Sequence, residues 1–364
     1  MRWRPPTDDE IQHSFPHAKK IPMPISDHQL ISAWKQVLTL SKLEHGRTVT
    51  ILTGASTHPQ TLACALVATQ DMGAIVNRLD LPPVNSEKAH SRDSLAYLGT
   101  TPLTGNTAAI AMLKASDLVL DLMTLLFSAE QHDILASGTK ILLAVEPPEV
   151  LARLVPTEAD RARVLAGAAK IAAAREMQIV SASGTDLRCP IGEFPVVSEY
   201  GFVDEPGRWD HWPSGFALTF PNEGGAHGTI VIDKGDILLP QKRYCSDRIV
   251  LTIERGYATR IDGGIDAELL SDYMAGFNDP EAFAISHIGW GLQPRARWST
   301  LGLYDREATI GMDARAFEGN FLFSLGPNNE AGGSRTTTCH IDIPLRKCTV
   351  RLDGLDVVRE GQVL

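Results

Sequence analysis

The sequence has few cysteines and no closely spaced pair of them, and this shortage excludes two kinds of small scaffold. The 364-residue chain carries five cysteines, an odd number, and no Cys-x-x-Cys motif. A disulfide framework or a structural zinc site is therefore not expected, and the pattern favours reduced thiols in the cytoplasm. Cys339 adjoins a candidate metal ligand, but alternation along a strand would point it to the opposite face, where it should pack.

Long hydrophobic runs and a surplus of positive charge are also missing. The most apolar window, residues 107–127, is interrupted by Lys114, Asp117 and Asp121, so no transmembrane helix is expected. Residues 1–10 contain acids and no apolar core, so no signal peptide is expected either. The formal net charge of -10 argues against nucleic acid or an anionic membrane as a partner, because both select basic surfaces.

The chain also lacks a glycine-rich phosphate loop. The nearest pattern, Gly289-Trp290-Gly291, has Pro294 at the position of the third glycine, so a dinucleotide site is not expected. Instead, the composition is that of an ordinary globular protein, with 43% hydrophobic and 21% charged residues. A chain of this length can bury a large core and favours two domains over one.

Helical and strand patterns alternate in the first half. Residues 1–25 are rich in proline and predict an irregular arm, and Asp27 is the expected N-cap of the first helix. Strands interleaved with helices predict a parallel sheet covered on both faces, so residues 1–184 should form a three-layer α/β domain. The expected strands cover residues 48–52, 74–78, 118–121 and 140–144, and the expected helices cover residues 27–43, 60–70, 106–115 and 157–175.

The pattern changes after residue 184. Glycine and proline become frequent, and short β-rich runs replace the long helices. Residues 185–364 are therefore predicted to form a β-rich (α+β) domain that carries the active site on its concave face. The parallel sheet of the first half is expected to serve as a scaffold and as one wall of the pocket. The expected strands cover residues 228–233, 248–253, 257–261, 320–324 and 349–352, with one helix near residues 267–275.

A histidine and an aspartate two residues apart, His340 and Asp342, are the first candidate metal ligands. Isoleucine and threonine flank the pair, and such β-branched residues favour a strand. In a strand, residues i and i+2 face the same side, so an imidazole and a carboxylate would stand side by side. A histidine from a separate segment would complete a 2-His-1-carboxylate face, which leaves coordination positions open for substrate and dioxygen.

His287 is the preferred third ligand. It lies in a run, residues 284–288, that predicts a short strand ending in glycines, and Gly289 and Gly291 would allow substrate or backbone to approach closely. Taken alone, neither the His-x-Asp triplet nor His287 requires a metal site. A His-x-Asp triplet often arises by chance in a chain of this size, and a lone histidine beside glycines is more often packed or hydrogen-bonded. Spacing alone leaves both alternatives open.

Four longer runs resemble a single enzyme family. They are ILLAVEPPEVL (residues 141–151), EPGRWDHWPSG (205–215), ISHIGWGLQP (285–294) and CHIDIP (339–344). Together they look like the 2,5-dihydroxypyridine 5,6-dioxygenases, which are the iron-dependent ring-opening enzymes of bacterial nicotinate breakdown. The similarity extends from Pro24 to near the C-terminus.

The resemblance implies a mononuclear non-haem Fe(II) enzyme of the extradiol type. Its iron ligands, two histidines and one aspartate, would fall on His287, His340 and Asp342. The implied reaction is cleavage of the C5–C6 bond of 2,5-dihydroxypyridine by O2 to give N-formylmaleamic acid. The family also implies a cytoplasmic homo-oligomer, and a hexamer is the size that it suggests.

Glu199 and His211 are the polar members of otherwise apolar or aromatic runs. Polar groups that converge on an apolar pocket can orient a flat heteroaromatic ring. The resemblance implies that both side chains hydrogen-bond the dihydroxypyridine. The alternatives are a solvated strand residue for Glu199 and a core histidine stacked between two tryptophans for His211. Asp210 and Asp186 are expected to be structural.

Phe127 departs from the family pattern. As the resemblance implies, a histidine at this position is the proposed base that takes a proton from the substrate, and a phenyl ring cannot accept that proton. Either activity is reduced, or the base lies elsewhere, or this chain is a substituted form. Phe127 also leaves open a catalytically inactive binding protein. His132 is near in sequence, but on a helix it would lie more than a turn away, so it is not expected to take over the role.

A more distant similarity points to another reaction class, the thermophilic-type metallo-aminopeptidases. They share the His-x-Asp ending and the two-domain plan, and their chemistry uses paired metals. The approximate equivalents of their other ligands would be His287, Phe216 or Ala217, and Leu322. A second metal would then lack donors, so an aminopeptidase-like hydrolase is the less favoured alternative.

Overall fold

The computed structural model describes residues 24–84, 100–125, 128–239, 241–304, 306 and 308–364. Phe127 lies outside these ranges, and so does the predicted irregular arm apart from its last two residues. Within the described ranges, no helix is long and apolar enough to cross a membrane. All five cysteines are buried as free thiols, and Cys339 packs in the core as predicted.

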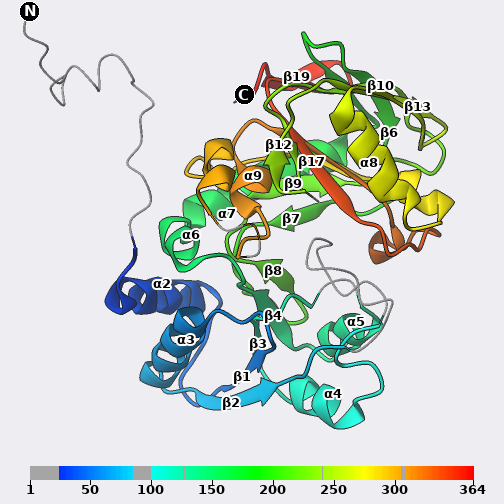
Figure 1. The fold of residues 1–364 in the computed structure, drawn as a ribbon. Helices are drawn as coiled ribbons and strands as arrows, with labels where there is room; N and C mark the ends of the chain where they lie inside the picture. Colours follow the sequence, from blue (N-terminus) through cyan, green and yellow to red (C-terminus); the bar gives the residue numbers. More distant parts are fainter. Residues whose placement is uncertain (1–23, 85–99, 126–127, 240, 305, 307) are drawn as a thin grey trace, which may run out of the picture.

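A five-stranded sheet organises the first half of the chain (Figure 1). All of its strand pairs are parallel. The predicted strands of this half are confirmed, and the fifth strand comes from far along the sequence. In spatial order the strands are β2 (Ile75–Asp80), β1 (Thr48–Thr53), β3 (Leu118–Asp121), β4 (Lys140–Leu143) and β8 (Trp209–His211).

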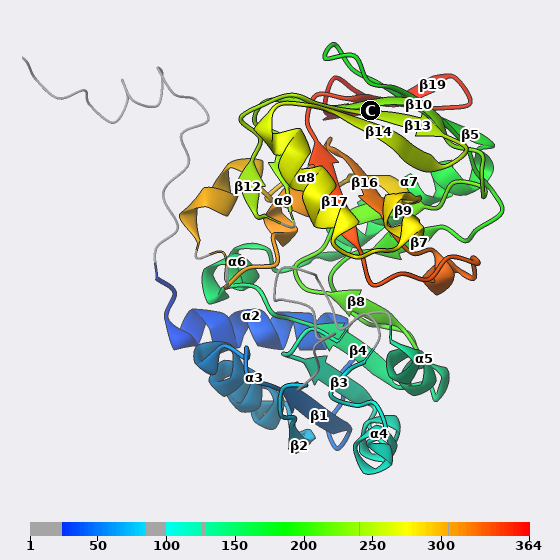
Figure 2. The ribbon, with the colours of Figure 1, turned by 45° about the vertical axis from the view of Figure 1, so that its right-hand side comes forward.

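Helices cover both faces of this sheet (Figures 1 and 2). Successive strand residues point to opposite faces, and Ile51 and Leu52 accordingly enter two separate core clusters. The first cluster includes helices α2 (Asp27–Leu40) and α3 (Pro59–Asp71), and the second includes α4 (Thr107–Lys114) and α5 (Ala129–Ala136). The predicted three-layer α/β arrangement is therefore confirmed.

The helix ends need one correction. Ser26, not Asp27, is the N-cap of α2, because its side chain accepts a hydrogen bond from the Gln29 backbone while the Gln29 side chain accepts one from the Ser26 backbone. This reciprocal capping box satisfies two backbone donors that a lone aspartate would not. Helix α7 (Glu158–Ala173) was predicted, whereas α5 and the short α6 (Pro148–Arg153) were not.

Antiparallel sheets make up most of the second half. The larger has the spatial order β14 (Tyr257–Gly263), β13 (Ile249–Glu254), β10 (His227–Ile232), β6 (Asp186–Pro190), β5 (Glu176–Val180), β18 (Thr349–Leu352), β19 (Leu355–Arg359) and β20 (Gln362–Val363). The smaller has the order β17 (Ile341–Leu345), β16 (Phe321–Leu325), β15 (Ile285–Gly291), β9 (Phe216–Thr219) and β7 (Val197–Glu199). All five strands predicted for this half are present.

Shorter elements complete the second half. They are the two-stranded ribbon of β11 (Ile237–Leu238) and β12 (Arg243–Tyr244), the helices α8 (Ile265–Ala275) and α9 (Met312–Ala316), and the 3-10 turns η1 (Pro280–Phe283), η2 (Trp298–Leu303) and η3 (Asn329–Ala331). Helix α8 matches the helix predicted for this half. The segment from η2 to α9 and the turn η3 matter most here, because both help to line the pocket described below.

Two strands cross the predicted domain boundary. β5 precedes residue 184 but belongs to the eight-stranded antiparallel sheet, and β8 follows it but extends the parallel sheet. The rings of Trp34 and Trp212 also meet edge to face, with centroids 4.9 Å apart. The two halves are therefore interleaved, and the division between residues 184 and 185 stays a prediction.

Glu146 ties the loop after β4 to the second half of the chain. Its carboxylate is buried and accepts hydrogen bonds from the Thr309 hydroxyl and, at 2.7 Å, from the Met312 backbone N–H. Burial raises the pKa of Glu146, although these two donors oppose the shift. The contact holds residues 309–312 against the parallel sheet.

We expect Glu146→Ala to lower the free energy of unfolding by about 2–4 kcal/mol, because two buried donors lose their acceptor. Urea denaturation measures this change. Glu149→Ala, which removes a half-buried carboxylate in the first turn of α6, should cost less than about 1 kcal/mol. Equal losses in the two variants would contradict a special role for the Glu146 contacts.

Candidate metal centre and substrate pocket

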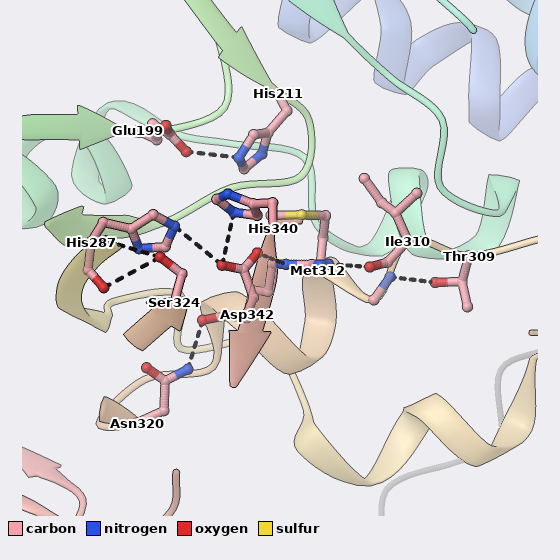
Figure 3. Close-up of polar contacts among 12 residues, drawn as sticks. Glu199, His211, His287, Thr309, Ile310, Met312, Asn320, Ser324, His340 and Asp342 are labelled. Atoms are coloured by element: carbon pink, nitrogen blue, oxygen red, sulfur yellow. Dashed lines mark hydrogen bonds and ion pairs between the residues drawn. The ribbon is translucent and has the colours of Figure 1, made fainter. Parts of the chain in front are cut away.

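The three predicted metal ligands converge at one point (Figure 3). The Nε2 atoms of His287 and His340 lie 3.1 Å and 3.2 Å from the same carboxylate oxygen of Asp342. All three side chains are buried, and their possible ligand atoms lie within 4.8 Å of one another. Two segments more than fifty residues apart in the sequence thus meet, as the spacing argument required.

These distances test whether the residues fit a metal ion. Two donor atoms bound at right angles to one ion, each about 2.1 Å from it, lie about 3 Å apart. The observed separations of 3.1 Å and 3.2 Å agree with that value. Two imidazoles and one carboxylate are also a donor set that suits divalent transition metals. The residues therefore fit a single metal ion.

A buried arginine balances the charge of the carboxylate. The Arg315 Nε donates to the second oxygen of Asp342 at 2.6 Å, and Arg315 is only 4% exposed. Burial alone would raise the pKa of Asp342, but the charges of His340 and Arg315 outweigh it and hold the pKa well below its usual range. Asp342 is therefore kept ionised with its first oxygen directed at the two imidazoles.

Local backbone geometry aims His287 into the pocket. β15 and β17 flank β16, and the register between β15 and β16 shifts between Ile285 and Ile288. Such a bulge adds one residue to a strand and re-aims a side chain. The Ser324 hydroxyl accepts a hydrogen bond from the His287 backbone N–H at 2.9 Å, and Ser324 is the register partner of Asp342.

Gly289 has a close backbone contact, which is one of the two approaches that the sequence suggested. A Cβ atom at this position would lie 2.1 Å from the Ala217 carbonyl oxygen of β9. Any larger residue would therefore push β9 away from β15. The glycine allows the central strands of the small sheet to stay paired beside the candidate metal site.

The candidate metal ligands lie in a largely apolar pocket that encloses about 970 Å³, including its open mouth. Both halves of the chain contribute to it, and the parallel sheet supplies part of its wall through Leu143, Trp209 and His211, as predicted. The apolar lining comprises Leu135, Leu143, Val197, Trp209, Phe216, Leu218, Phe220, Ile310, Met312 and Leu322. The polar lining outside the three ligands comprises Gln131, His132, Glu199, His211, Arg315 and Glu330.

Glu199 and His211 form a hydrogen-bonded pair in the pocket wall (Figure 3). Their closest atoms, Oε2 and Nε2, lie 2.7 Å apart. The His211 Nδ1 lies 2.7 Å from the Pro213 carbonyl and must be the donor there, because a carbonyl only accepts. Burial would lower the pKa of His211, but the Glu199 carboxylate and Asp210 reverse the shift and raise it.

Asp210 is structural, as expected. Arg208 and the backbone N–H groups of Tyr200 and His211 donate to its carboxylate. Although Asp210 lies within ligand range of the Glu199–His211 pair, its oxygens are already engaged. Asp186 is on β6, where it accepts a hydrogen bond from Gln178, and it does not line the pocket.

Four polar residues of the pocket lining were not predicted from the sequence: Gln131, His132, Arg315 and Glu330. Arg315 and Glu330 lie in segments with no recognisable motif, and Glu330 is in a turn rich in glycine and asparagine that is typical of a solvated loop. His132 was set aside, yet it lines the pocket mouth from helix α5 as an exposed residue. Only the location of α5 over the pocket, which no local pattern reveals, could have pointed to it.

Glu223 holds the turn that carries Glu330. Its exposed carboxylate accepts hydrogen bonds from the Asn328 side chain at 3.0 Å and from the Ser334 backbone at 2.9 Å. These donors, with the Ser334 hydroxyl, lower the pKa of Glu223 to about 2. The Glu223 side chain therefore binds residues on both sides of the turn η3 from outside the pocket.

Two imidazoles and a carboxylate that converge in an apolar pocket are typical of metal-dependent enzymes that bind small molecules. Comparison with known proteins makes the assignment specific. The chain belongs to the 2,5-dihydroxypyridine 5,6-dioxygenase family, whose sequence profile matches residues 29–364.

Individual relatives agree with this membership. The chain is 54% identical over 342 residues to a 2,5-dihydroxypyridine 5,6-dioxygenase of Pseudomonas putida, covering 94% of this chain and 98% of the relative. A solved structure of the dioxygenase from Pseudomonas putida KT2440 matches with a TM-score of 0.91 over 94% of this chain and 98% of that one. AmpT from Thermus thermophilus matches with a TM-score of 0.62 at 13% identity, over 93% and 99% of the two chains, which shows a shared fold.

We expect the stabilising effect of Glu223 to depend on pH. Its pKa in the folded protein is about 2, below the ordinary value of 4.5, so its contribution is present above about pH 4.5 and is lost as the pH falls toward 2. Glu223→Gln should therefore be less stable than the parent at neutral pH, and the difference should shrink below about pH 4.5. Urea midpoints measured across this range check the prediction, and a difference that grows on acidification would contradict it.

Proposed function

We propose that this protein is an Fe(II)-dependent 2,5-dihydroxypyridine 5,6-dioxygenase that opens the ring between C5 and C6 with O2 and yields N-formylmaleamic acid. The observation that carries the proposal is the convergence of His287, His340 and Asp342 in an aromatic-lined pocket of a chain from this family. Anaerobic addition of substrate to the Fe(II)-loaded protein, followed by O2, tests it through loss of the pyridine absorbance and uptake of O2.

The three converging side chains would hold the ferrous ion. When bound to such a face, Fe(II) keeps positions open at which substrate and O2 can meet, and this is the chemistry that it would supply. Arg315 keeps Asp342 ionised and fixes its orientation. Hydrogen-bonded partners of this kind strengthen metal binding and set the direction of the ligand atoms.

The pocket walls would orient the substrate. Trp209, Phe216 and Phe220 offer flat apolar surfaces to an aromatic ring, and they exclude water from around it. The Glu199–His211 pair offers polar atoms in the same wall, so it can hydrogen-bond a ring hydroxyl. The hydrogen bond between Glu199 and His211 keeps both side chains in place before the substrate binds.

The hydrolase alternative lacks the donors for a second metal. Phe216 and Leu322, the approximate equivalents of aminopeptidase ligands, line the pocket with apolar side chains. Paired-metal hydrolysis needs two ions about 3.5–4 Å apart, and the Glu199–Asp210–His211 group is engaged in its own hydrogen bonds. Release of amine from an amino-acid amide with Zn(II) or Co(II), without O2 uptake, would favour the hydrolase instead.

Two further proposals follow from the family. We propose that the chain assembles as a homo-oligomer, with a hexamer as the expected size, and that it works in the cytoplasm. Light scattering coupled to size-exclusion chromatography measures the assembly. A monomeric species across the working concentration range would overturn that proposal without affecting the assignment of the reaction.

We expect His340→Ala and Asp342→Ala each to abolish both metal retention and turnover, because a face with two donors binds far more weakly than one with three. Metal analysis of anaerobically prepared protein checks this directly. His227→Ala, which removes an exposed histidine on β10 outside the pocket, should retain the parent's metal content. A variant that kept full iron would remove its residue from the ligand set.

We expect Phe127→His to raise kcat about 10-fold or more with a smaller change in KM, because a positioned base speeds proton transfer. Phe127→Asn adds polarity without a comparable base and should not reproduce the gain. Steady-state loss of substrate absorbance measures both variants. If turnover stayed unchanged in the histidine variant, residue 127 would not be the position of the base.

A further inference from the structure

Glu330 presents an unsatisfied carboxylate oxygen to the pocket. It lies in the turn η3, and its side chain lines the pocket together with those of His287 and His340. Among the described residues, its buried Oε2 has no hydrogen-bond partner. Leaving a buried acceptor without a donor destabilises a fold, so the oxygen requires a partner that the described residues do not supply.

The surroundings of Glu330 fix its side chain in the pocket wall. Glu223 binds the turn at Asn328 and Ser334. On the far side, Arg335 donates to the Ile285 carbonyl at 2.7 Å, and its backbone N–H donates to the Asn328 side chain. The turn that carries Glu330 is therefore tied to two neighbouring segments.

Glu330 is not part of the candidate metal set. The ligand atoms of His287, His340 and Asp342 lie within 4.8 Å of one another, and no oxygen of Glu330 joins that group. Burial raises the pKa of Glu330, and the charges of His340 and His287 oppose the shift. A carboxylate near the imidazoles but outside their ligand group is suited to contact whatever binds beside the metal.

Glu199, the other glutamate in the pocket wall, differs in this respect. Its Oε2 is already paired with His211 at 2.7 Å. Glu330 thus differs from Glu199 in offering the pocket a buried carboxylate oxygen that accepts no hydrogen bond from a described residue. A hydroxypyridine offers two donors on the ring edge away from its 5-hydroxyl: the 2-hydroxyl group, or the ring N–H of the pyridone tautomer.

We propose that Glu330 is a specificity-determining residue whose carboxylate accepts a hydrogen bond from the 2-hydroxyl or ring N–H of the bound hydroxypyridine. This inference rests on the proposed function, because it takes the substrate from there. A site built to bind a ring donor rejects analogues without that donor much more strongly than an apolar wall does. Glu330 would therefore distinguish the substrate from otherwise similar aromatic rings.

The test compares anaerobic binding of three ligands to the metal-loaded protein. They are 2,5-dihydroxypyridine, benzene-1,4-diol, which lacks the ring nitrogen, and 3-hydroxypyridine, which lacks the 2-hydroxyl and has no ring N–H in its neutral hydroxy form. We expect Glu330→Gln to weaken binding of 2,5-dihydroxypyridine about 10- to 100-fold. Binding of 3-hydroxypyridine should change less than about 2-fold. Benzene-1,4-diol separates the two donors: it loses affinity if Glu330 contacts the hydroxyl and keeps it if Glu330 contacts the N–H.

Controls separate this role from damage to the pocket. Glu318→Gln removes an exposed carboxylate outside the pocket and should bind all three ligands as the parent does. Metal content should be unchanged in Glu330→Gln. Unaltered binding of 2,5-dihydroxypyridine, an equal loss for all three ligands, or loss of metal would each overturn the proposal. Failure of the parent protein itself to bind or open 2,5-dihydroxypyridine would instead overturn the proposed function.

Discussion

The structure around the site depends on one buried carboxylate. Asp342 faces two imidazoles with one oxygen and the Arg315 guanidinium with the other. Burial would raise the pKa of Asp342, but the charges of His340 and Arg315 and the hydrogen bonds from the two imidazoles lower it and keep the group ionised. The bulge in β15 aims His287 at this carboxylate, β16 lies between β15 and β17, and α9 brings Arg315 to the same point.

The sequence predicted the elements well where the pattern is local. Four of the five parallel strands, three of the four covering helices and the pairing of His340 with Asp342 follow from periods of 3.6 and 2 residues, which need no knowledge of distant contacts. His287 required more, since the bulge that aims it depends on pairing with β16. The family resemblance, rather than spacing, chose among the histidines.

The remaining features depend on tertiary placement. β8 has only three residues, too few for a recognisable strand pattern, and its pairing with β4 makes it a strand of the parallel sheet. Arg315 and Glu330 reach the pocket because α9 and η3 are held there by Glu146 and Glu223, residues far from them in sequence. A charged residue in a short helix or turn carries no local sign of such a role, so these positions could not be predicted.

The bulge at the start of β15 has a consequence for comparing distant homologues. Side chains alternate between the faces of a strand, so inserting or deleting one residue near Ser286 would rotate His287 to the opposite face. A sequence alignment could then show the two histidines and the aspartate conserved in a protein that can no longer form the metal site. The number of residues between the bulge and the glycines that follow therefore predicts whether a homologue retains the metal site better than the presence of the histidine alone does.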